Sequence, residues 1–476
     1  MQSTDSPRST PRSSGPRPGR PSAPRTRPAS SGAYGSSSRS SASGRSSGPR
    51  RSSGTSAFRP SRASALEQAL TDSAALPLPE SPTFTGLGLS ERMAGALRRR
   101  GIETPTSVQA RTLPDALAGR DVLGRAQTGA GKTLAFGLPM LERIAAATGG
   151  AAPTPRRPQG LVVVPTRELA RQVHDALTPF AHVLGLKLTT VYGGAGMRGQ
   201  VQALRRGVHL VVATPGRLED HIRQNNTGLG DVMVTVLDEA DFMADLGFVP
   251  AIQRLLDLVP AGSQRLLFSA TLDRGVEDLV RRYLVDPALH AVTPDAGAEV
   301  TMEHRLLRVR REDKVAVAAK IAARQGRTLL FVRTQLGADR LAEQLTEAGV
   351  PAAPLHGGMR QGERQKALAR FTDGSGPVLV ATDVAARGIH VDGVDLVVHA
   401  DPPADAKDYL HRSGRTARAG RSGTVVSLLL PDQVRAGEAL QRALGTGAVS
   451  EPARPGDAVV AQIAAAGQPS TEVAGA

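Results

Sequence analysis

The sequence predicts an α/β protein of two similar domains, each a parallel sheet covered by helices on both faces. Short apolar runs alternate with helical stretches across residues 76–293, and a second series of the same kind covers residues 304–432. A Gly-Gly turn occurs in both series, at Gly193-Gly194 and at Gly357-Gly358. With 476 residues and 40% hydrophobic content, the chain is long enough to build both cores.

The strands of these domains are expected at short runs rich in leucine and β-branched residues. In the first domain these runs are Leu161–Val164, Leu210–Ala213, Val234–Leu237 and Leu266–Phe268. In the second domain they lie near Leu329–Val332, Val378–Ala381, Leu396–Val398 and Val425–Leu430. Between the first two runs, Leu169, Val173 and Leu177 recur every four residues, as one face of a helix requires. Residues 294–303 lack such periodicity and are expected to form a linker.

Both ends of the chain have compositions that predict disorder. Residues 1–75 are mainly Ser, Arg, Pro and Gly, and residues 1–62 contain twelve arginines against one acid, Asp5. Such a segment cannot bury enough apolar surface to offset its ordering entropy. Its charge favours binding to a polyanion such as RNA, and a solvated tail is the alternative. Residues 433–476 are expected to form a short helix followed by an Ala/Gly-rich tail.

The overall composition excludes several classes of protein. The chain has no cysteine, which excludes disulfides and thiolate metal sites, so a reducing cytoplasm is expected. No stretch of 18 apolar residues occurs, so no membrane segment is predicted. Aromatic residues make up only 3% of the chain, which allows little stacking on nucleic-acid bases.

A Gly-rich segment that ends in Lys-Thr predicts a binding site for nucleotide phosphates. The segment is Ala126-Gln127-Thr128-Gly129-Ala130-Gly131-Lys132-Thr133, with alanine at the first position, where the general pattern has glycine. The loop N–H groups would bind the β-phosphate, Lys132 would neutralise the β- and γ-phosphate oxygens, and Thr133 would offer a hydroxyl to Mg²⁺. Considered alone, the segment is also compatible with an ordinary Gly-rich turn before a helix.

Two carboxylates follow the expected strand Val234–Leu237. Asp238 and Glu239 begin where this strand ends, and open α/β sheets bind their ligands at the carboxyl ends of strands. Asp238 would bind Mg²⁺ through water, and Glu239 would orient and deprotonate an attacking water molecule. A surface acidic turn is the alternative, but the pair and the Gly-rich loop together favour a site of nucleotide hydrolysis.

With Asp238-Glu239-Ala240-Asp241 in this place, the chain resembles the DEAD-box ATP-dependent RNA helicases. The resemblance covers roughly residues 84–432, and three further segments carry it: Gly101–Gln109, Ser269-Ala270-Thr271 and Tyr409–Arg418. It is closest to the short bacterial, RhlE-like members. It implies two tandem RecA-like domains that bind ATP, Mg²⁺ and RNA.

The resemblance also implies roles for individual residues at the ATP site. Phe84 would stack on adenine, Gln109 would read the adenine edge, and the loop from Ala126 to Thr133 would hold the phosphates. His390 stands where the family has an aspartate that bonds the ribose, so this contact would be weaker. The catalytic residues implied are Lys132, Asp238, Glu239 and the two arginine fingers, Arg415 and Arg418.

The remaining residues implied by the resemblance couple ATP to RNA or contact RNA directly. The coupling residues are Ser269, Thr271, Asp241, Asp383, Arg387 and His411. The RNA contacts are Arg167, Gly193, Gly194, Thr214, Arg217, Gly357, Gln361, Arg364 and Thr382. These groups grip phosphates and 2′-hydroxyls without reading bases, so RNA binding is expected to be largely independent of sequence.

The expected function is an RNA-stimulated ATPase that locally separates RNA duplexes when ATP closes its two domains. We expect a cytoplasmic monomer that acts on single-stranded RNA and short duplexes, with ribosomal or RNA-decay proteins as possible partners. Two alternatives stay open from the motifs alone. One is an ATP-gated RNA clamp that separates few strands, and the other is a DNA helicase or translocase.

Overall fold

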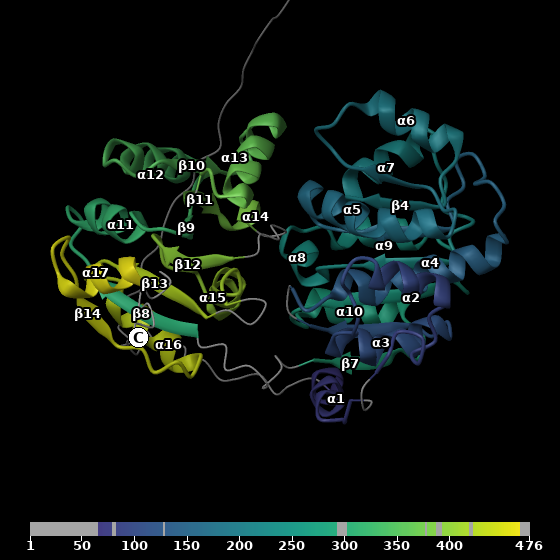
Figure 1. The fold of residues 1–476 in the computed structure, drawn as a ribbon, viewed down its shortest axis with the longest axis horizontal. Coiled ribbons are helices and arrows are strands. Elements are labelled where there is room, and N and C mark those ends of the chain that lie inside the picture. The colour runs from purple at the N-terminus through teal and green to yellow at the C-terminus, as the bar shows by residue number, and fades with distance from the viewer. Residues whose placement is uncertain are drawn as a thin grey trace, which may run out of the picture. The chain divides into compact units, whose positions relative to one another are not determined.

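Two parallel sheets form the centre of the protein. The computed structural model describes residues 65–78, 82–126, 129–292, 302–376, 378–386, 393–417 and 422–466. Residues 1–64 of the basic N-terminal segment (the arm), most of the predicted linker and residues 467–476 lie outside these ranges. Each sheet has seven strands, which confirms the predicted α/β fold class (Figure 1).

The first sheet belongs to the first domain, and its strands all run parallel. Their order across the sheet is β3-β4-β2-β5-β6-β1-β7. The strands are β1 (Val122–Arg125), β2 (Gly160–Val163), β3 (Leu188–Val191), β4 (Leu210–Ala213), β5 (Val234–Leu237), β6 (Gln264–Ser269) and β7 (Ala288–Ala291). The four strands expected from the sequence are β2, β4, β5 and β6. Strands β1, β3 and β7 were not predicted.

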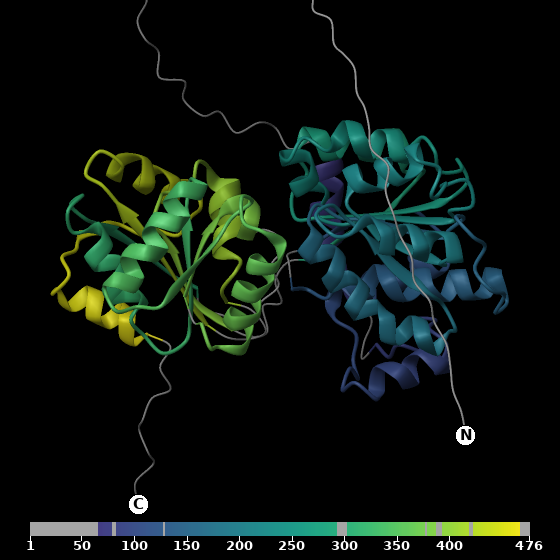
Figure 2. The same ribbon diagram turned by 90° about the horizontal axis from the view of Figure 1, so that it is seen from above.

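Helices cover both faces of the first sheet, because alternate strand residues point to opposite faces. One face packs against α2 (Glu91–Arg98), α3 (Ser107–Leu117), α4 (Lys132–Thr148) and α5 (Arg167–Val183). The other face packs against α1 (Ala65–Ala74), α6 (Met197–Arg206), α7 (Pro215–Arg223), α8 (Ala240–Asp245), α9 (Val249–Leu256) and α10 (Arg274–Tyr283). Figure 2 shows these two helical layers on either side of the sheet.

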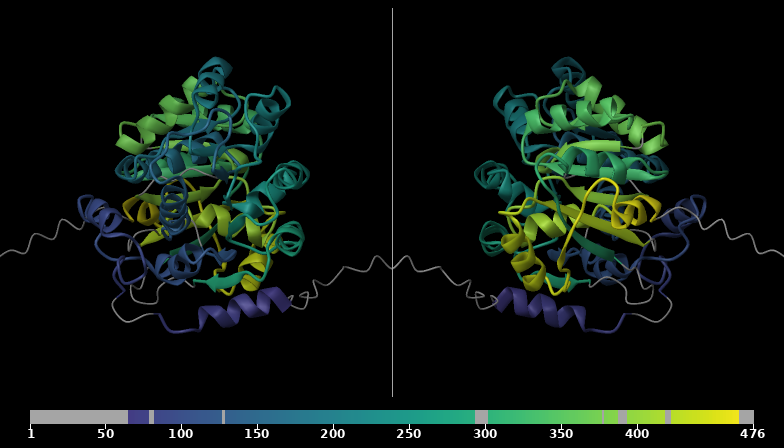
Figure 3. Two further views of the ribbon diagram at one scale, coloured as in Figure 1. Left: turned by 90° about the vertical axis from the view of Figure 1, so that its right-hand side faces the viewer. Right: turned by 90° about the vertical axis from the view of Figure 1, so that its left-hand side faces the viewer.

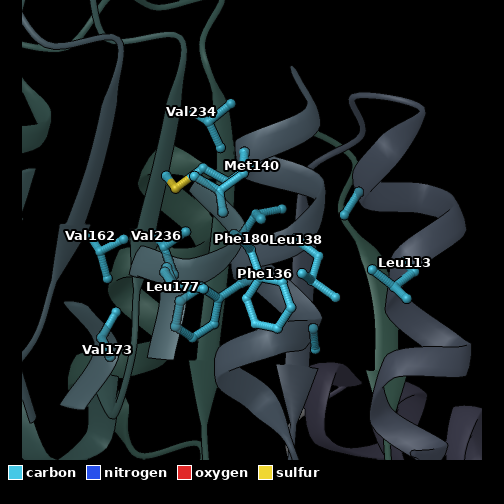
Figure 4. Close-up of a cluster of buried hydrophobic side chains, with 14 of the residues drawn as sticks. Leu113, Phe136, Leu138, Met140, Val162, Val173, Leu177, Phe180, Val234 and Val236 are labelled. Carbon is cyan, nitrogen blue, oxygen red and sulfur yellow. The ribbon is translucent and has the colours of Figure 1, made fainter. Parts of the chain in front are cut away.

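The core on the first of these faces is built from buried hydrophobic side chains. Phe136 of α4 is fully buried, and its ring centroid lies 5.6 Å from that of Phe268 on β6. Leu177 of α5 and Val162 and Val236 of the sheet complete this layer (Figure 4). The predicted periodic leucines and valines of α5 therefore face the core, as their spacing requires.

The second sheet repeats the order of the first, as β10-β11-β9-β12-β13-β8-β14. Its strands are β8 (Met302–Arg308), β9 (Arg327–Val332), β10 (Ala352–Leu355), β11 (Val378–Thr382), β12 (Val394–His399), β13 (Gly423–Leu429) and β14 (Ser450–Pro452). Helices α11 (Lys314–Ala322), α12 (Gln335–Glu347) and α17 (Ala458–Ala465) pack on one face. Helices α13 (Gln361–Asp373), α14 (Asp383–Ala386), α15 (Ala406–Ser413) and α16 (Val434–Ala443) pack on the other.

The structure corrects three predicted boundaries. Residues Ala65–Ala74 were expected to be disordered but form α1, because Leu70 has a buried place in the first core. Met302 and Glu303 were assigned to the linker but belong to β8. The expected Ala/Gly-rich tail after the first C-terminal helix includes β14, which pairs with β8, and α17, which buries Val460 and Ile463.

No helix among the described residues is long and apolar enough to span a bilayer.

Candidate active site and RNA groove

Three neighbouring strands of the first sheet end at the predicted nucleotide site. Strands β5, β6 and β1 are adjacent, and they end at Leu237, Ser269 and Arg125. Parallel strands place their carboxyl ends on one edge of the sheet, where ligands of such sheets bind. The Gly-rich loop, the Asp238-Glu239 pair and the Ser269-Ala270-Thr271 segment are thereby brought together, although more than 100 residues separate the first from the other two.

The Gly-rich loop turns directly into α4. Gly131 caps α4 with φ of 89°, a backbone conformation that favours glycine. A Cβ atom there would lie only 2.7 Å from Nε2 of Gln109, so a larger residue would displace the Gln109 amide. Lys132 is 5% exposed, and its Nζ donates to the carbonyl oxygen of Ala126 at 3.1 Å and lies 4.0 Å from Oδ1 of Asp238. Gln127 and Thr128 lie outside the described residues.

The predicted adenine residues occupy two different environments. Gln109 is bound to the loop, because its Nε2 donates to the carbonyl of Gly131 at 3.1 Å and its Oε1 accepts the N–H of Thr106 at 3.0 Å. Phe84 is only 4% exposed and lies in the hydrophobic core of the first domain. The burial of Phe84 favours a structural role for this ring over stacking on adenine.

The two carboxylates after β5 are buried side by side. Asp238 is 3% exposed, Glu239 is 7% exposed, and Oδ1 of Asp238 accepts the N–H of Glu239 at 2.9 Å. Burial raises the pKa of Asp238 to about 6, against the lowering effect of the neighbouring Lys132. Glu239 has φ of 52° and ψ of 50°, a left-handed conformation that is costly for a residue with a side chain.

Mg²⁺ fits this donor set in one particular way. No group of three or more His, Cys, Asp or Glu residues in the described ranges could form a complete metal site. Mg²⁺ usually keeps several waters and is bound by one or two carboxylates together with substrate phosphates. A single buried carboxylate at Asp238, beside the first turn of α4 that carries Thr133, agrees with that mode of binding.

The predicted coupling residues of the first domain form a hydrogen-bonded cluster. Oδ2 of Asp241 accepts both the N–H and the hydroxyl of Thr271 at 3.0 Å, and Ser269 donates its hydroxyl to the carbonyl of Thr271 at 2.6 Å. Burial alone would raise the pKa of Asp241. The hydrogen bond from His411 and the charge of Lys132 outweigh burial and hold this pKa well below its usual range.

Residues of the second domain reach the same site. Nε2 of His411 lies 3.7 Å from Oδ2 of Asp241. A small pocket is lined by Lys132, Glu239, Asp241, Phe242, Ala270, His411 and Arg415. Arg415 is 6% exposed, and its Nε donates to the carbonyl of His411 at 3.3 Å. Arg387, His390 and Arg418 lie outside the described residues.

Arg412 is a residue of this region to which the sequence assigned no role. It forms a two-pronged ion pair with Asp383, at 2.6 Å from Nε to Oδ1 and 2.8 Å from Nη2 to Oδ2. The Asp383 carboxylate, predicted to couple ATP to RNA, therefore holds helix α15, which ends two residues before Arg415. The cluster of basic residues from His411 to Arg418 was the available sequence signal, but it does not show which arginine turns inward.

Most of the predicted RNA contacts line one open groove of about 350 Å³. Its lining includes Arg167, Gly193, Thr214, Arg217, Gly357, Gln361 and Arg364. Nη1 of Arg167 donates to Oε1 of Gln361 at 3.1 Å. Gly194 has φ of 79°, and a Cβ there would lie 2.1 Å from Nη1 of Arg167, so glycine lets this arginine approach the chain. Gly194 and Thr382 are not among the lining residues.

Arg364, one of the predicted RNA contacts, is buried and makes hydrogen bonds within the protein. Its Nε donates to Oε1 of Glu168 at 2.8 Å, and its Nη2 donates to the carbonyl of Ala385 at 3.1 Å. Glu168 lies on α5 of the first domain and also accepts a hydrogen bond from Gln361. Lys407 makes a second link of this kind, because it pairs with Asp245 and Asp273 of the first domain.

Comparison with known proteins agrees with this arrangement. The model of the DEAD/DEAH box helicase family matches residues 106–279, and that of the helicase conserved C-terminal domain matches residues 313–420. The DEAD-box ATP-dependent RNA helicase CshA of Geobacillus kaustophilus is 38% identical over 354 residues, which are 74% of either chain. CshA of Bacillus licheniformis is 39% identical over 361 residues, 74% of this chain and 72% of the relative.

Two solved structures of RNA complexes share the fold. One is Dbp5 of S. cerevisiae bound to RNA and ADP BeF3, with a TM-score of 0.69, 26% identity, and coverage of 80% of this chain and 99% of that chain. The other is Mss116p bound to ssRNA and AMP-PNP, with a TM-score of 0.69, 26% identity, and coverage of 83% and 85%. The two domains, each built on one sheet, are thus RecA-like, and the chain belongs to the DEAD-box ATP-dependent RNA helicases.

Proposed function

We propose that this enzyme binds RNA largely without regard to sequence and separates short duplexes locally by ATP-driven closure of its two domains. The observation that carries the proposal is the pocket that contains Lys132 and Glu239 of the first domain together with His411 and Arg415 of the second. A site that needs groups from both domains is complete only when they meet. ATP and RNA that both prefer this closed state would each favour binding of the other.

In this proposal the hydrolysis step uses residues already held in place. Lys132 neutralises the phosphate oxygens, and Glu239 orients the attacking water and accepts its proton. Thr133 and Asp238 would hold Mg²⁺, which when bound supplies positive charge to the phosphate oxygens. Arg415 contributes charge to the γ-phosphate, and Arg418 is proposed as the second arginine finger. Hydrolysis then removes the γ-phosphate contacts and lets the domains separate.

The proposed RNA grip follows from the chemistry of the groove. Its polar groups are three guanidinium groups, at Arg167, Arg217 and Arg364, with the carboxylate that pairs with Arg364, an amide, two hydroxyls and glycine backbone. These groups bind phosphates and 2′-hydroxyls, which every RNA sequence presents. Leu246, Phe248 and Val384 also line the groove, so some apolar contact with the strand is expected.

The test is ATP hydrolysis by the full chain at one fixed salt concentration, with no nucleic acid, with single-stranded RNA and with single-stranded DNA of the same sequence. Strong stimulation by RNA alone is expected. Lys132→Ala should abolish turnover, because the phosphate charge loses its buried partner. Equal stimulation by DNA would favour the alternative of a DNA motor. Normal turnover by Lys132→Ala would overturn the assignment of the Gly-rich segment Ala126–Thr133 as the phosphate loop.

Duplex release distinguishes a helicase from an ATP-gated RNA clamp. A helicase that resets after hydrolysis releases many short duplexes per molecule, so release should continue when the protein is substoichiometric. A clamp would release no more duplex than the protein present. We also propose that the protein is a cytoplasmic, RhlE-like monomer with ribosomal or RNA-decay proteins as partners. Measurement of its mass in solution tests the monomer, and identification of the proteins recovered with it tests the partners.

A further inference from the structure

Helix α1 lies outside the segment matched by the helicase family models, yet it packs against the sheet that carries the ATP site (Figure 3). Leu70 of α1 is fully buried and belongs to the same core cluster as Leu123 of β1. The hydroxyl oxygen of Ser73 accepts the N–H of Ala291 on the edge strand β7 at 2.9 Å. One side of α1 is therefore part of the folded first domain.

The polar side chains of α1 reach the strand that leads into the phosphate loop. Arg125 is the last residue of β1, directly before Ala126. Its guanidinium group pairs with Glu67 and donates to Oγ1 of Thr71 at 3.2 Å. Glu67 and Thr71 are four residues apart and share one face of the helix. The Arg125 backbone is paired with Ser269 on one side and with Ala291 on the other, so α1 holds the strand residue that directly precedes the Gly-rich loop.

A second set of contacts links α1 to the helix that carries the predicted adenine amide. Arg111 of α3 donates to the carbonyl oxygens of Ser73 at 3.1 Å and Ala74 at 3.2 Å, at the C-terminal end of α1. A cation is favourable at that end because its carbonyls lack helical partners. Arg111 lies two residues after Gln109, which bonds the loop at Gly131.

We propose that α1 is a brace for nucleotide binding, and that Glu67 and Arg125 are positioning residues for the phosphate loop. Helix α1 contacts both the strand before the loop and the helix that touches the loop from the other side. Loss of these polar contacts should therefore weaken nucleotide binding without removing any group that touches the nucleotide. The inference rests on the proposed phosphate-loop assignment.

The test compares three full-length variants that alter α1 alone. Glu67→Ala removes the carboxylate that pairs with Arg125, and Thr71→Val removes the hydroxyl that Arg125 also contacts. Asp72→Ala is the matched control, because it removes the same charge from the same helix at a site whose carboxylate accepts a hydrogen bond from Gln68. Binding of a fluorescent ADP analogue with Mg²⁺, in the absence of RNA, gives the dissociation constant of each.

Glu67→Ala is expected to raise the dissociation constant about fivefold, equivalent to about 1 kcal/mol, and Thr71→Val to raise it less. Asp72→Ala should match the unmodified protein. The turnover rate at saturating ATP and RNA should stay within about twofold for all three, because α1 supplies no reacting group. Glu67→Gln keeps an acceptor oxygen for Arg125 and should recover part of the affinity.

Two results would overturn the brace. One is a dissociation constant for Glu67→Ala equal to that of Asp72→Ala, and the other is a lower melting temperature with unchanged affinity. In either case α1 would only cover the edge of β7. Lys132→Ala separates this failure from that of the phosphate-loop assignment. If Lys132→Ala still binds the analogue, the loop assignment itself is wrong.

Discussion

Glu239 combines two unfavourable features, a left-handed backbone and a buried carboxylate, that indicate a functional role. Its left-handed backbone costs on the order of 1–3 kcal/mol, and its carboxylate is buried beside that of Asp238. Neither feature stabilises the fold. A residue kept in such a place is best explained by the position it gives the carboxylate at the end of β5, next to Lys132 and the second-domain residues His411 and Arg415.

Glu239→Gln should therefore separate binding from chemistry. The amide fills the same volume but accepts protons poorly, so ATP hydrolysis should fall by about 10²-fold or more. ATP and RNA should still bind together, and their complex should persist. The measurement is single-turnover hydrolysis with retention of RNA on a native gel. Glu277→Gln, which changes a carboxylate on α10 that pairs with Arg281, is the matched control.

Loss of ATP binding in Glu239→Gln, with normal binding in the control, would instead assign Glu239 a structural role.

The motifs in the sequence predict which residues form the site better than they predict the contacts that each side chain makes. Lys132, Asp238 and Asp241 lie together because strand order places their segments on one edge, as the motifs indicate. The burial of Phe84 and the pairing of Arg364 with Glu168 could not be read from the motifs. Both depend on the position of neighbouring helices, which a short motif does not specify.

At the scale of elements, the C-terminal segment shows where composition misleads. Residues 450–465 are rich in alanine and carry few large apolar side chains, so no packed structure was predicted. The structure needs only two such side chains, because Val460 and Ile463 are 1% and 2% exposed in the second core. Strand β14 pairs in parallel with β8, which lies far from both of its partners, β13 and β14, in the sequence. Long-range pairing of this kind leaves little local signal.

Ile463→Ala tests whether α17 belongs to the second domain. A buried isoleucine truncated to alanine typically costs about 2–5 kcal/mol, through lost burial and the cavity that remains. The urea midpoint of the second domain should fall by the corresponding amount. Gln462→Ala, on the exposed side of the same helix, should leave the midpoint almost unchanged. Equal midpoints for the two variants would return this segment to the predicted frayed tail.

At the scale of the whole molecule, charge is unevenly distributed along the chain. Most of the net charge of +15 comes from the twelve arginines of residues 1–62, ahead of α1. An arm of this kind would bind RNA by releasing counterions, and each phosphate contact adds about 0.7 to the slope of log affinity against log salt for single strands. The arm lies outside the described residues, so its role rests on its sequence.

Deletion of residues 2–62 should lower RNA affinity and flatten its salt dependence. The maximal hydrolysis rate should change little, because α1 and both domains remain. RNA binding is measured by fluorescence anisotropy at several salt concentrations, and hydrolysis at saturating RNA. An arm of the same length with serine in place of its arginines controls for chain length. An unchanged salt slope would identify the arm as a solvated tail.

The identical strand order of the two sheets also bears on synthesis of the protein. Strand β1 lies between β6 and β7, so Val122–Arg125 has neither neighbour until residues 264–291 have left the ribosome. Strand β8 waits in the same way for β13 and β14. Each nascent domain therefore completes its sheet only when its last strands emerge, and until then the strand that leads into the phosphate loop is exposed to chaperones and to aggregation.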